Sequence, residues 1–132
     1  MAELRHIRPE GLSNAPTYSH AVAATGGTTI FISGQIAVDS AGKTVGVGDL
    51  AAQTEQVMTN LGIALEAAGA AFADVVKITT FVVNYEPAHR PVIAEVRGRY
   101  LSADNPPAST LLGVTALAAP DYLIEIEATA VI

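Results

Sequence analysis

The chain has 132 residues, of which half are hydrophobic and 15% are charged. A chain of this length fits a single domain, residues 1–132, because it can bury roughly two thirds of its unfolded surface in one core. The formal charge is -6 and the seven basic residues are scattered, so there is no basic stripe to neutralise phosphates. The composition therefore argues against nucleic acid as the main partner.

The absence of cysteine excludes disulfides, thiolate metal sites and cysteine nucleophiles. The first residues, MAELRHIRPE, lack the apolar segment of a signal peptide. The alanine-rich stretches are interrupted by Glu, Gln and Gly before they reach the ~18 apolar residues of a membrane span. We therefore expect a cytoplasmic protein with no membrane partner.

The N-terminal third is predicted to contain three short strands. Residues Leu4–Arg8, Ser19–Ala24 and Thr28–Gln35 form alternating or β-branched runs, and Gly26-Gly27 is a signal for a two-residue hairpin between the last two. Together these runs predict an antiparallel meander. Residues 39–48 are rich in Gly, Ser and Asp without any period, which predicts a loop.

A helix of about five turns is predicted next, with Asp49 as its N-cap. Apolar residues recur at helical spacing from Leu50 to Ala68, and Gly69 is of the type favoured just past a helix end. Residues 74–83 are short, β-branched and almost continuously apolar, which predicts a central strand.

A second helix is predicted from Pro87 to about Leu101, because proline is tolerated in a first helical turn. After a turn at Asp104 to Pro107 come two β-rich runs, residues 108–116 and 122–132. The predicted order is therefore βββαβαββ, an α+β fold with one mixed sheet and two helices on one face. The other sheet face remains to be buried, and the apolar excess of the composition favours an oligomer that buries it.

The sequence offers few residues with the spacing of a reactive centre. His6, His20 and His89 lie far apart and show none of the spacings of metal sites, and the glycines form neither G-x-G-x-x-G nor a P-loop. We expect no metal and no cofactor. In Glu125-Ile126-Glu127, strand alternation puts both carboxylates on one face about 7 Å apart, where they either line a pocket or face solvent.

Seven short motifs, taken together and in order, resemble those of the YjgF/RidA (Rid) family. The resemblance extends from about residue 14 to 131, and the register of the motifs makes coincidence implausible. The motifs are P-T-Y-S-H-A-V (16–22), F-I-S-G-Q-I (31–36), Q-T-E-Q-V-M-T-N-L (53–61), A-A-G (67–69), D-V-V-K-I-T-T-F-V (74–82), P-A-S-T (107–110) and E-I-E-A (125–128).

The resemblance implies a chorismate-mutase-like fold, in which three subunits pack sheet against sheet and form clefts for a small-molecule metabolite at their interfaces. It also implies cofactor-free hydrolysis of 2-imino or 2-enamino acids to 2-keto acids and ammonia. By match, Tyr18 and Glu125 are the expected catalytic residues. The expected substrate-binding residues are Ser33, Gly34, Ala94, Arg97, Ser109 and Thr110.

The chain departs from the family at P-A-S-T, where deaminases carry an arginine that binds the substrate carboxylate and this chain carries Ser109. A serine hydroxyl cannot supply that positive charge. A second departure is Ala94, at a position where deaminases commonly carry Asn. Arg97 follows one helical turn later, and our hypothesis is that it replaces the lost guanidinium; the alternative is a surface arginine paired with carboxylates such as Glu95.

Simpler interpretations stand beside two of these assignments. Tyr18 could be a core aromatic with a surface hydroxyl, and Gly34 could serve only a bulge or a close backbone approach. Two other functions also remain open. The first is a non-catalytic metabolite-binding or sensor protein, which the missing arginine favours. The second is the ribonuclease or translation inhibitor activity ascribed to some family members, which the acidity of this chain disfavours.

Overall fold

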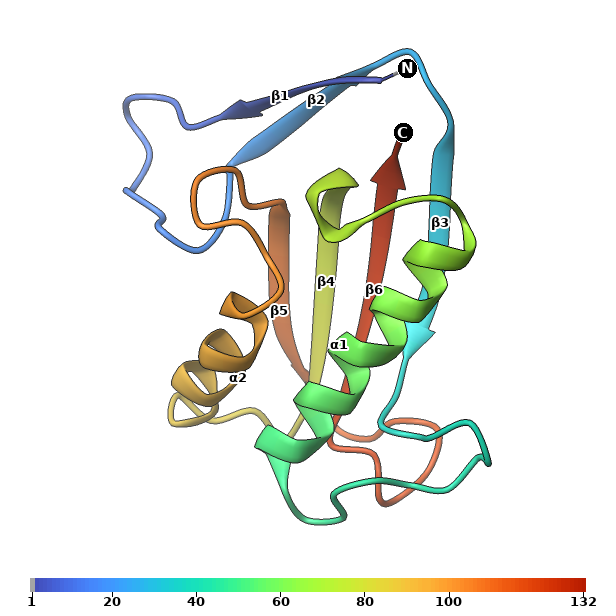
Figure 1. The fold of residues 1–132 in the computed structure, drawn as a ribbon. Helices are drawn as coiled ribbons and strands as arrows, with labels where there is room; N and C mark the ends of the chain where they lie inside the picture. Colours follow the sequence, from blue (N-terminus) through green and yellow to red (C-terminus); the bar gives the residue numbers. More distant parts are fainter. Residues whose placement is uncertain (1) are drawn as a thin grey trace.

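The computed structural model describes residues 2–132 and has a four-stranded sheet with two helices on one of its faces (Figure 1). The strand order is β3 (Thr29–Gln35), β6 (Ile124–Val131), β4 (Val75–Val83) and β5 (Ala108–Val114). β6 pairs antiparallel with both β3 and β4, whereas β4 and β5 are parallel. The sheet is therefore mixed, as predicted, and β5 is one of its edges.

Helix α1 (Leu50–Ala67) has the ends that the sequence predicts. The Asp49 carboxylate accepts a hydrogen bond from the backbone N–H of Ala52 at 3.0 Å, which satisfies one of the amides that lack an intrahelical partner. Gly69 has a φ of 78°, the left-handed conformation that terminates many helices. A short 3-10 helix, η1 (Phe72–Asp74), then leads into β4.

Helix α2 (His89–Gly98) is shorter than the predicted span of Pro87 to about Leu101. The His89 ring accepts a hydrogen bond from the backbone N–H of Glu86 at 3.0 Å, which closes a turn before the helix begins. At the other end, bonds of the i to i−3 type tighten the chain at Arg99 and Tyr100. Neither α1 nor α2 is long and apolar enough to cross a membrane, and residues 2–132 contain no other helix that could.

The core lies between the helices and the sheet. Every second residue of β6 faces the helices, because side chains alternate along a strand, and these residues are almost fully buried. They pack against the apolar stripe of α1 and against Ile93 and Val96 of α2. The largest fully buried apolar side chains are Met58, Leu61, Leu65, Ile78, Ile93, Ile124 and Ile126.

The predicted N-terminal meander is wrong in its pairing. β1 (Glu3–Ile7) and β2 (Ala21–Thr25) form a separate two-stranded antiparallel ribbon, and β3 pairs with β6 instead of β2. Gly26 and Gly27 do have the positive φ values of a tight turn. After this turn the chain pairs with the C-terminal strand and not with β2, because Thr28 and Ile132 exchange two backbone hydrogen bonds of 2.7 and 3.0 Å.

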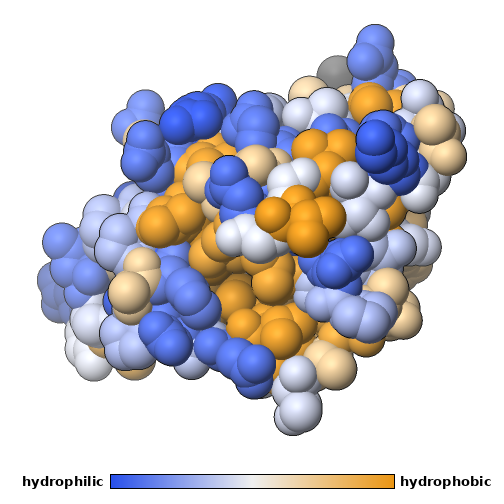
Figure 2. Space-filling model, turned by 90° about the horizontal axis from the view of Figure 1, so that it is seen from below, coloured by the Kyte–Doolittle hydropathy of each residue, from blue (hydrophilic) through white to orange (hydrophobic). Residues whose placement is uncertain are grey.

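The sheet face opposite the helices remains open in a single chain. Phe31 on β3 is 82% exposed and Leu112 on β5 is 37% exposed, although both are large apolar residues. On another side of the molecule, the one seen from below, hydrophobic residues also gather in a hollow with hydrophilic residues around it (Figure 2). Exposed apolar surface of this kind on a small domain marks a binding surface.

Candidate active site

A cavity of about 400 Å³ lies between α2, β5 and the segment 16–18 that precedes the ribbon strand β2. It is the larger of the two hollows described for residues 2–132. Four residues expected at the site from the sequence line it, namely Tyr18, Ala94, Arg97 and Ser109. The other lining residues are Pro16, Thr17, Tyr85, Arg90, Ile93, Gly98, Leu101, Ser102, Ala103 and Leu111.

The Arg97 guanidinium reaches across the cavity from α2 to β5. Its Nη2 donates a hydrogen bond to the Ser109 hydroxyl oxygen at 3.2 Å. Its Nε is buried and has no hydrogen-bond partner among residues 2–132. Both ion pairs found in that part of the chain involve Arg99, so Arg97 is a cation without a carboxylate partner.

Burial lowers the pKa of Arg97 to about 10, because the charged guanidinium loses hydration inside the protein. The group still carries its proton at neutral pH. A buried cation with an unsatisfied N–H and no counter-ion is costly, and natural proteins seldom leave one without a ligand or partner. The arrangement therefore has the character of an anion-binding site, with the Ser109 hydroxyl beside the positive charge.

The wall formed by segment 16–18 is fastened to the chain just before β5. The buried Ser19 hydroxyl donates a hydrogen bond to the carbonyl oxygen of Pro106 at 2.6 Å. The backbone N–H of Ser19 donates to the carbonyl oxygen of Pro107 at 3.0 Å. These bonds hold Tyr18 beside the strand that carries Ser109. The Tyr18 ring also makes an edge-to-face contact with His20, with ring centroids 5.3 Å apart.

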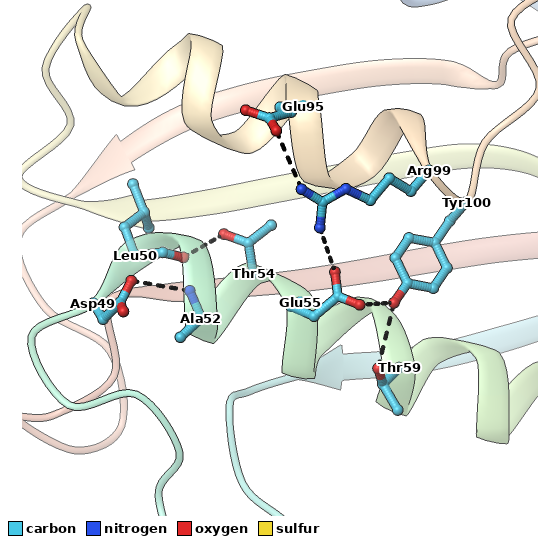
Figure 3. A network of polar contacts seen from close by, with 9 residues as sticks. All are labelled: Asp49, Leu50, Ala52, Thr54, Glu55, Thr59, Glu95, Arg99 and Tyr100. Atoms are coloured by element: carbon cyan, nitrogen blue, oxygen red, sulfur yellow. Dashed lines mark hydrogen bonds and ion pairs between the residues drawn. The ribbon is translucent and has the colours of Figure 1, made fainter.

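Helix α2 is tied to α1 by a polar network just beyond Arg97 (Figure 3). Arg99 forms ion pairs with Glu55 on α1 at 3.5 Å and with Glu95 on α2 at 3.2 Å. The Tyr100 hydroxyl donates to Glu55, and Thr59 lies 3.5 Å from it. Desolvation, followed by the bond to Glu55, raises the pKa of Tyr100. The network fixes the C-terminal end of α2 and so limits where the Arg97 side chain can lie.

Glu125 lies outside this cavity. It pairs in register with Phe81 on β4 and alternates with the buried Ile124 and Ile126, which puts its side chain on the open face of the sheet. The carboxylate occupies the space above Gly34, where a Cβ would stand 2.0 Å from the Glu125 Oε2 atom. Gly34 therefore leaves the room in which the Glu125 carboxylate lies.

The remaining expected residues also lie away from the cavity. Ser33 and Gly34 belong to a bulge in β3, between the paired residues Ile32 and Gln35. Thr110 accepts a hydrogen bond from the Lys77 ammonium at 2.6 Å. Within one chain the eight expected residues thus form two groups, four around the Arg97 cavity and four on or beside the open sheet face.

Sequence reasoning missed several cavity residues. Arg90 could have been found, since Arg90, Ala94 and Arg97 are spaced i, i+4 and i+7 and so share one face of α2. Leu101 and Ser102 lie beyond the helix and Tyr85 before it, and no local pattern places them at the cavity. Among residues 2–132 no cluster of three or more His, Cys, Asp or Glu side chains could hold a metal ion.

Comparison with known proteins gives the family. A family model described as Endoribonuclease L-PSP matches residues 10–132. The human 2-iminobutanoate/2-iminopropanoate deaminase is 35% identical over 114 residues, which cover 86% of this chain and 79% of that protein. Protein DfrA of Myxococcus xanthus is 40% identical over 114 residues, which cover 86% of this chain and 84% of that protein.

The solved structures agree. The crystal structure of YyfB from Yersinia pestis, described as a protein of unknown function of the conserved Rid family, has a TM-score of 0.92 and 44% identity and covers 98% of both chains. This likeness confirms the predicted α+β fold. The family model, the sequence relatives and the shared fold lead to one conclusion: the chain belongs to the Rid family, which also bears the description Endoribonuclease L-PSP.

Proposed function

We propose that this protein is a hydrolytic deaminase of 2-imino and 2-enamino acids that binds the substrate carboxylate on Arg97. The observation that carries the proposal is the guanidinium of Arg97, whose buried Nε has no hydrogen-bond partner and which pairs with no carboxylate among residues 2–132, while it reaches the hydroxyl of Ser109. Ser109 stands where deaminases of the family have their carboxylate-binding arginine. In this chain the positive charge comes to the same place from α2 instead of β5.

A carboxylate in the cavity would meet both needs of Arg97. It would neutralise the buried charge and accept from the unsatisfied Nε. A hydrogen bond to a charged group contributes about 1.5–3 kcal/mol, roughly ten- to a hundredfold in affinity. This is the size of effect that the family arginine would supply, so its replacement by serine does not by itself remove anion binding.

The acid–base group of the proposed reaction is Glu125, supplied by a neighbouring subunit of a homotrimer. Within one chain Glu125 and Arg97 lie on opposite faces of the sheet, so they cannot act on one substrate molecule. The exposed Phe31 and Leu112 support a neighbour packed on the open face, and the edge strand β5 supports a site at the boundary. An oligomer would also bury the apolar excess of the chain.

The chemistry requires no group beyond these residues and a water molecule. Arg97 holds the carboxylate and so fixes the adjacent C=N carbon. Glu125 accepts a proton from the water that adds to this carbon and gives it to the nitrogen, which yields a carbinolamine. The carbinolamine then transfers its hydroxyl proton to the nitrogen and loses ammonia, which leaves the 2-keto acid. The overall balance is one imino acid and one water to one keto acid and one ammonia.

The name of the human relative supports this activity, whereas the name of the family model points to RNA cleavage. The charge of -6 and a cavity with only two arginines argue against a surface that tracks phosphates. A binding protein without turnover is the second candidate, which the separation of Arg97 and Glu125 within one chain favours. Turnover distinguishes the two.

The test removes the arginine at position 97 and then restores an arginine at position 109. Imino acids with short and long side chains are released by an L-amino acid oxidase, and semicarbazide traps what the protein leaves. We expect Arg97→Ala to slow imine removal by ten- to a hundredfold, and the double change Arg97→Ala with Ser109→Arg to restore part of it. Arg8→Ala, which removes an exposed arginine outside the cavity, is the matched control.

Each alternative has its own outcome. If wild-type protein binds 2-keto acids but does not accelerate imine loss, the protein is a metabolite binder. If Arg97→Ala and Arg8→Ala behave alike, Arg97 is not the carboxylate anchor. Salt-sensitive retention of RNA that is unaffected by Arg97→Ala would favour the ribonuclease description instead.

A further inference from the structure

We infer that the Arg97 cavity selects acids with a large apolar side chain, branched aliphatic or aromatic, over the three- and four-carbon acids named in the relatives. The inference rests on the proposed function and specifies its substrate class. Its first basis is the apolar part of the cavity wall. Tyr85, Ile93, Leu101 and Leu111 line the cavity and are either members of the hydrophobic core or packed against it.

The second basis is the size of the cavity. Its volume of about 400 Å³ falls within the ~300–1,000 Å³ range of sites that bury drug-sized ligands. A three-carbon imino acid has about six non-hydrogen atoms and would leave most of this space to water against an apolar wall. A ligand with several more carbons would displace that water and gain affinity from it.

The third basis is the position of the charges. Arg97 is half-buried at the cavity wall with Ser109 and its Nε is buried, whereas the other lining cation, Arg90, is exposed about two turns earlier on α2. Only one desolvated cation therefore faces the interior. This favours a ligand with one carboxylate, bound at Arg97, and an uncharged side chain in the rest of the cavity. A second buried carboxylate would lack a desolvated cationic partner.

The small side chain of Ala94 leaves space in the cavity beside α2. Its methyl group lies one helical turn before Arg97 and lines the same cavity. The residue is itself exposed, so a larger side chain at this position would fill the cavity without disturbing the core. Ala94 is thus a residue that sets the length of the acceptable side chain, and it offers a direct means of altering specificity.

The test is calorimetric titration with 2-keto acids, which are the products of the proposed reaction and stable in water. The probes are pyruvate, 4-methyl-2-oxopentanoate, phenylpyruvate and the dicarboxylate 2-oxoglutarate, with 4-methylpentan-2-one as a neutral control. Each buried methylene adds about fourfold in affinity, so 4-methyl-2-oxopentanoate should bind on the order of 50-fold more tightly than pyruvate. The neutral ketone should not bind measurably.

The Ala94→Phe variant tests the cavity directly. We expect the affinity ratio of 4-methyl-2-oxopentanoate to pyruvate to fall at least tenfold, because the phenyl ring takes the space of the apolar body. Ala94→Ser, which has nearly the same size, is the matched control and should keep the wild-type ratio. A ratio that is the same in Ala94→Phe and Ala94→Ser would overturn the role of Ala94.

Failure of the inference is distinguishable from failure of the proposed function. If pyruvate or 2-oxoglutarate binds at least as tightly as 4-methyl-2-oxopentanoate, and binding still depends on Arg97, the size selection is wrong and the carboxylate anchor stands. If none of the acids binds, or if Arg97→Ala changes none of the affinities, both proposals fall together.

Discussion

At the scale of single residues, Arg97 places a charge where folding alone would favour an apolar side chain. Its guanidinium is desolvated, and among residues 2–132 its only side-chain hydrogen bond is to a neutral hydroxyl. Such a residue costs stability in the free protein and gains its counter-ion when a ligand binds. Binding sites commonly show this conflict between stability and function.

This conflict gives a stability prediction. We expect Arg97→Met, which keeps the length of the side chain without its charge, to raise the free energy of unfolding by about 1–3 kcal/mol at pH 7 while carboxylate binding is lost. Chemical denaturation at fixed protein concentration measures the first and titration the second. A less stable Arg97→Met protein would show that the charge is already well compensated.

The stability that Arg97→Met gains over the wild-type protein is expected to change with pH in one direction. Burial lowers the pKa of Arg97 to about 10 in the folded chain, well below the pKa of the same side chain in the unfolded chain. Below pH 10 the group is protonated in both states and the cost of burying the charge is fully present. Between these values the unfolded chain binds more protons, so the stability of the wild-type protein rises with pH and the advantage of Arg97→Met shrinks.

The residues of the candidate site could be predicted from the sequence only in part. The spacing of Ala94 and Arg97 on a helix indicated that both could line one cavity. The path of the Arg97 side chain to Ser109 depends on how α2 packs on β5, and no local pattern contains that information. The room that Gly34 leaves for Glu125 likewise joins two strands far apart in the chain.

At the scale of elements, local chemistry set the boundaries of α1 correctly. The side chain of Asp49 caps the first turn, and Gly69 adopts the left-handed conformation just after the last. Both signals act within a few residues of the helix end, so they can be read without knowing the fold. The turn at Gly26 and Gly27 was equally local, yet the pairing inferred from it was wrong.

The reason for that error is physical. A turn fixes the direction of the chain but not the partner of the next strand, and β3 finds its partner in β6, about a hundred residues away. Pairing over such distances is decided by packing and by the hydrogen bonds available at the C-terminus, here those between Thr28 and Ile132. The four-stranded sheet was therefore predictable as a class, but its separation from the β1–β2 ribbon was not.

The cap of α1 gives a prediction that is independent of the site. We expect Asp49→Ala to lower the free energy of unfolding by about 1 kcal/mol, because the backbone N–H of Ala52 loses its partner. Glu66→Ala, at an exposed position of the same helix, is the control and should change stability by less than half of that amount. Equal effects of the two changes would show that the cap contributes nothing specific.

At the scale of the whole molecule, the central claim is that a functional site contains Arg97 of one subunit and Glu125 of another. A single chain holds these side chains on opposite faces of its sheet and leaves large apolar residues exposed on the same face as Glu125. A trimer with cyclic symmetry would repeat the same contact three times and form three sites. Each of these sites would take its arginine from one copy and its glutamate from the next.

Activity of mixed oligomers tests this claim most directly. Arg97→Ala and Glu125→Gln proteins are each expected to keep at most about a tenth of the wild-type activity. The two would be unfolded together in equal amounts, refolded and assayed for imine removal. Random trimers in which each site joins two copies would recover about a quarter of the wild-type activity, since one site in each mixed trimer keeps both residues. Refolded mixtures no more active than the separate variants, beside a refolded wild-type control that regains its activity, would contradict the account.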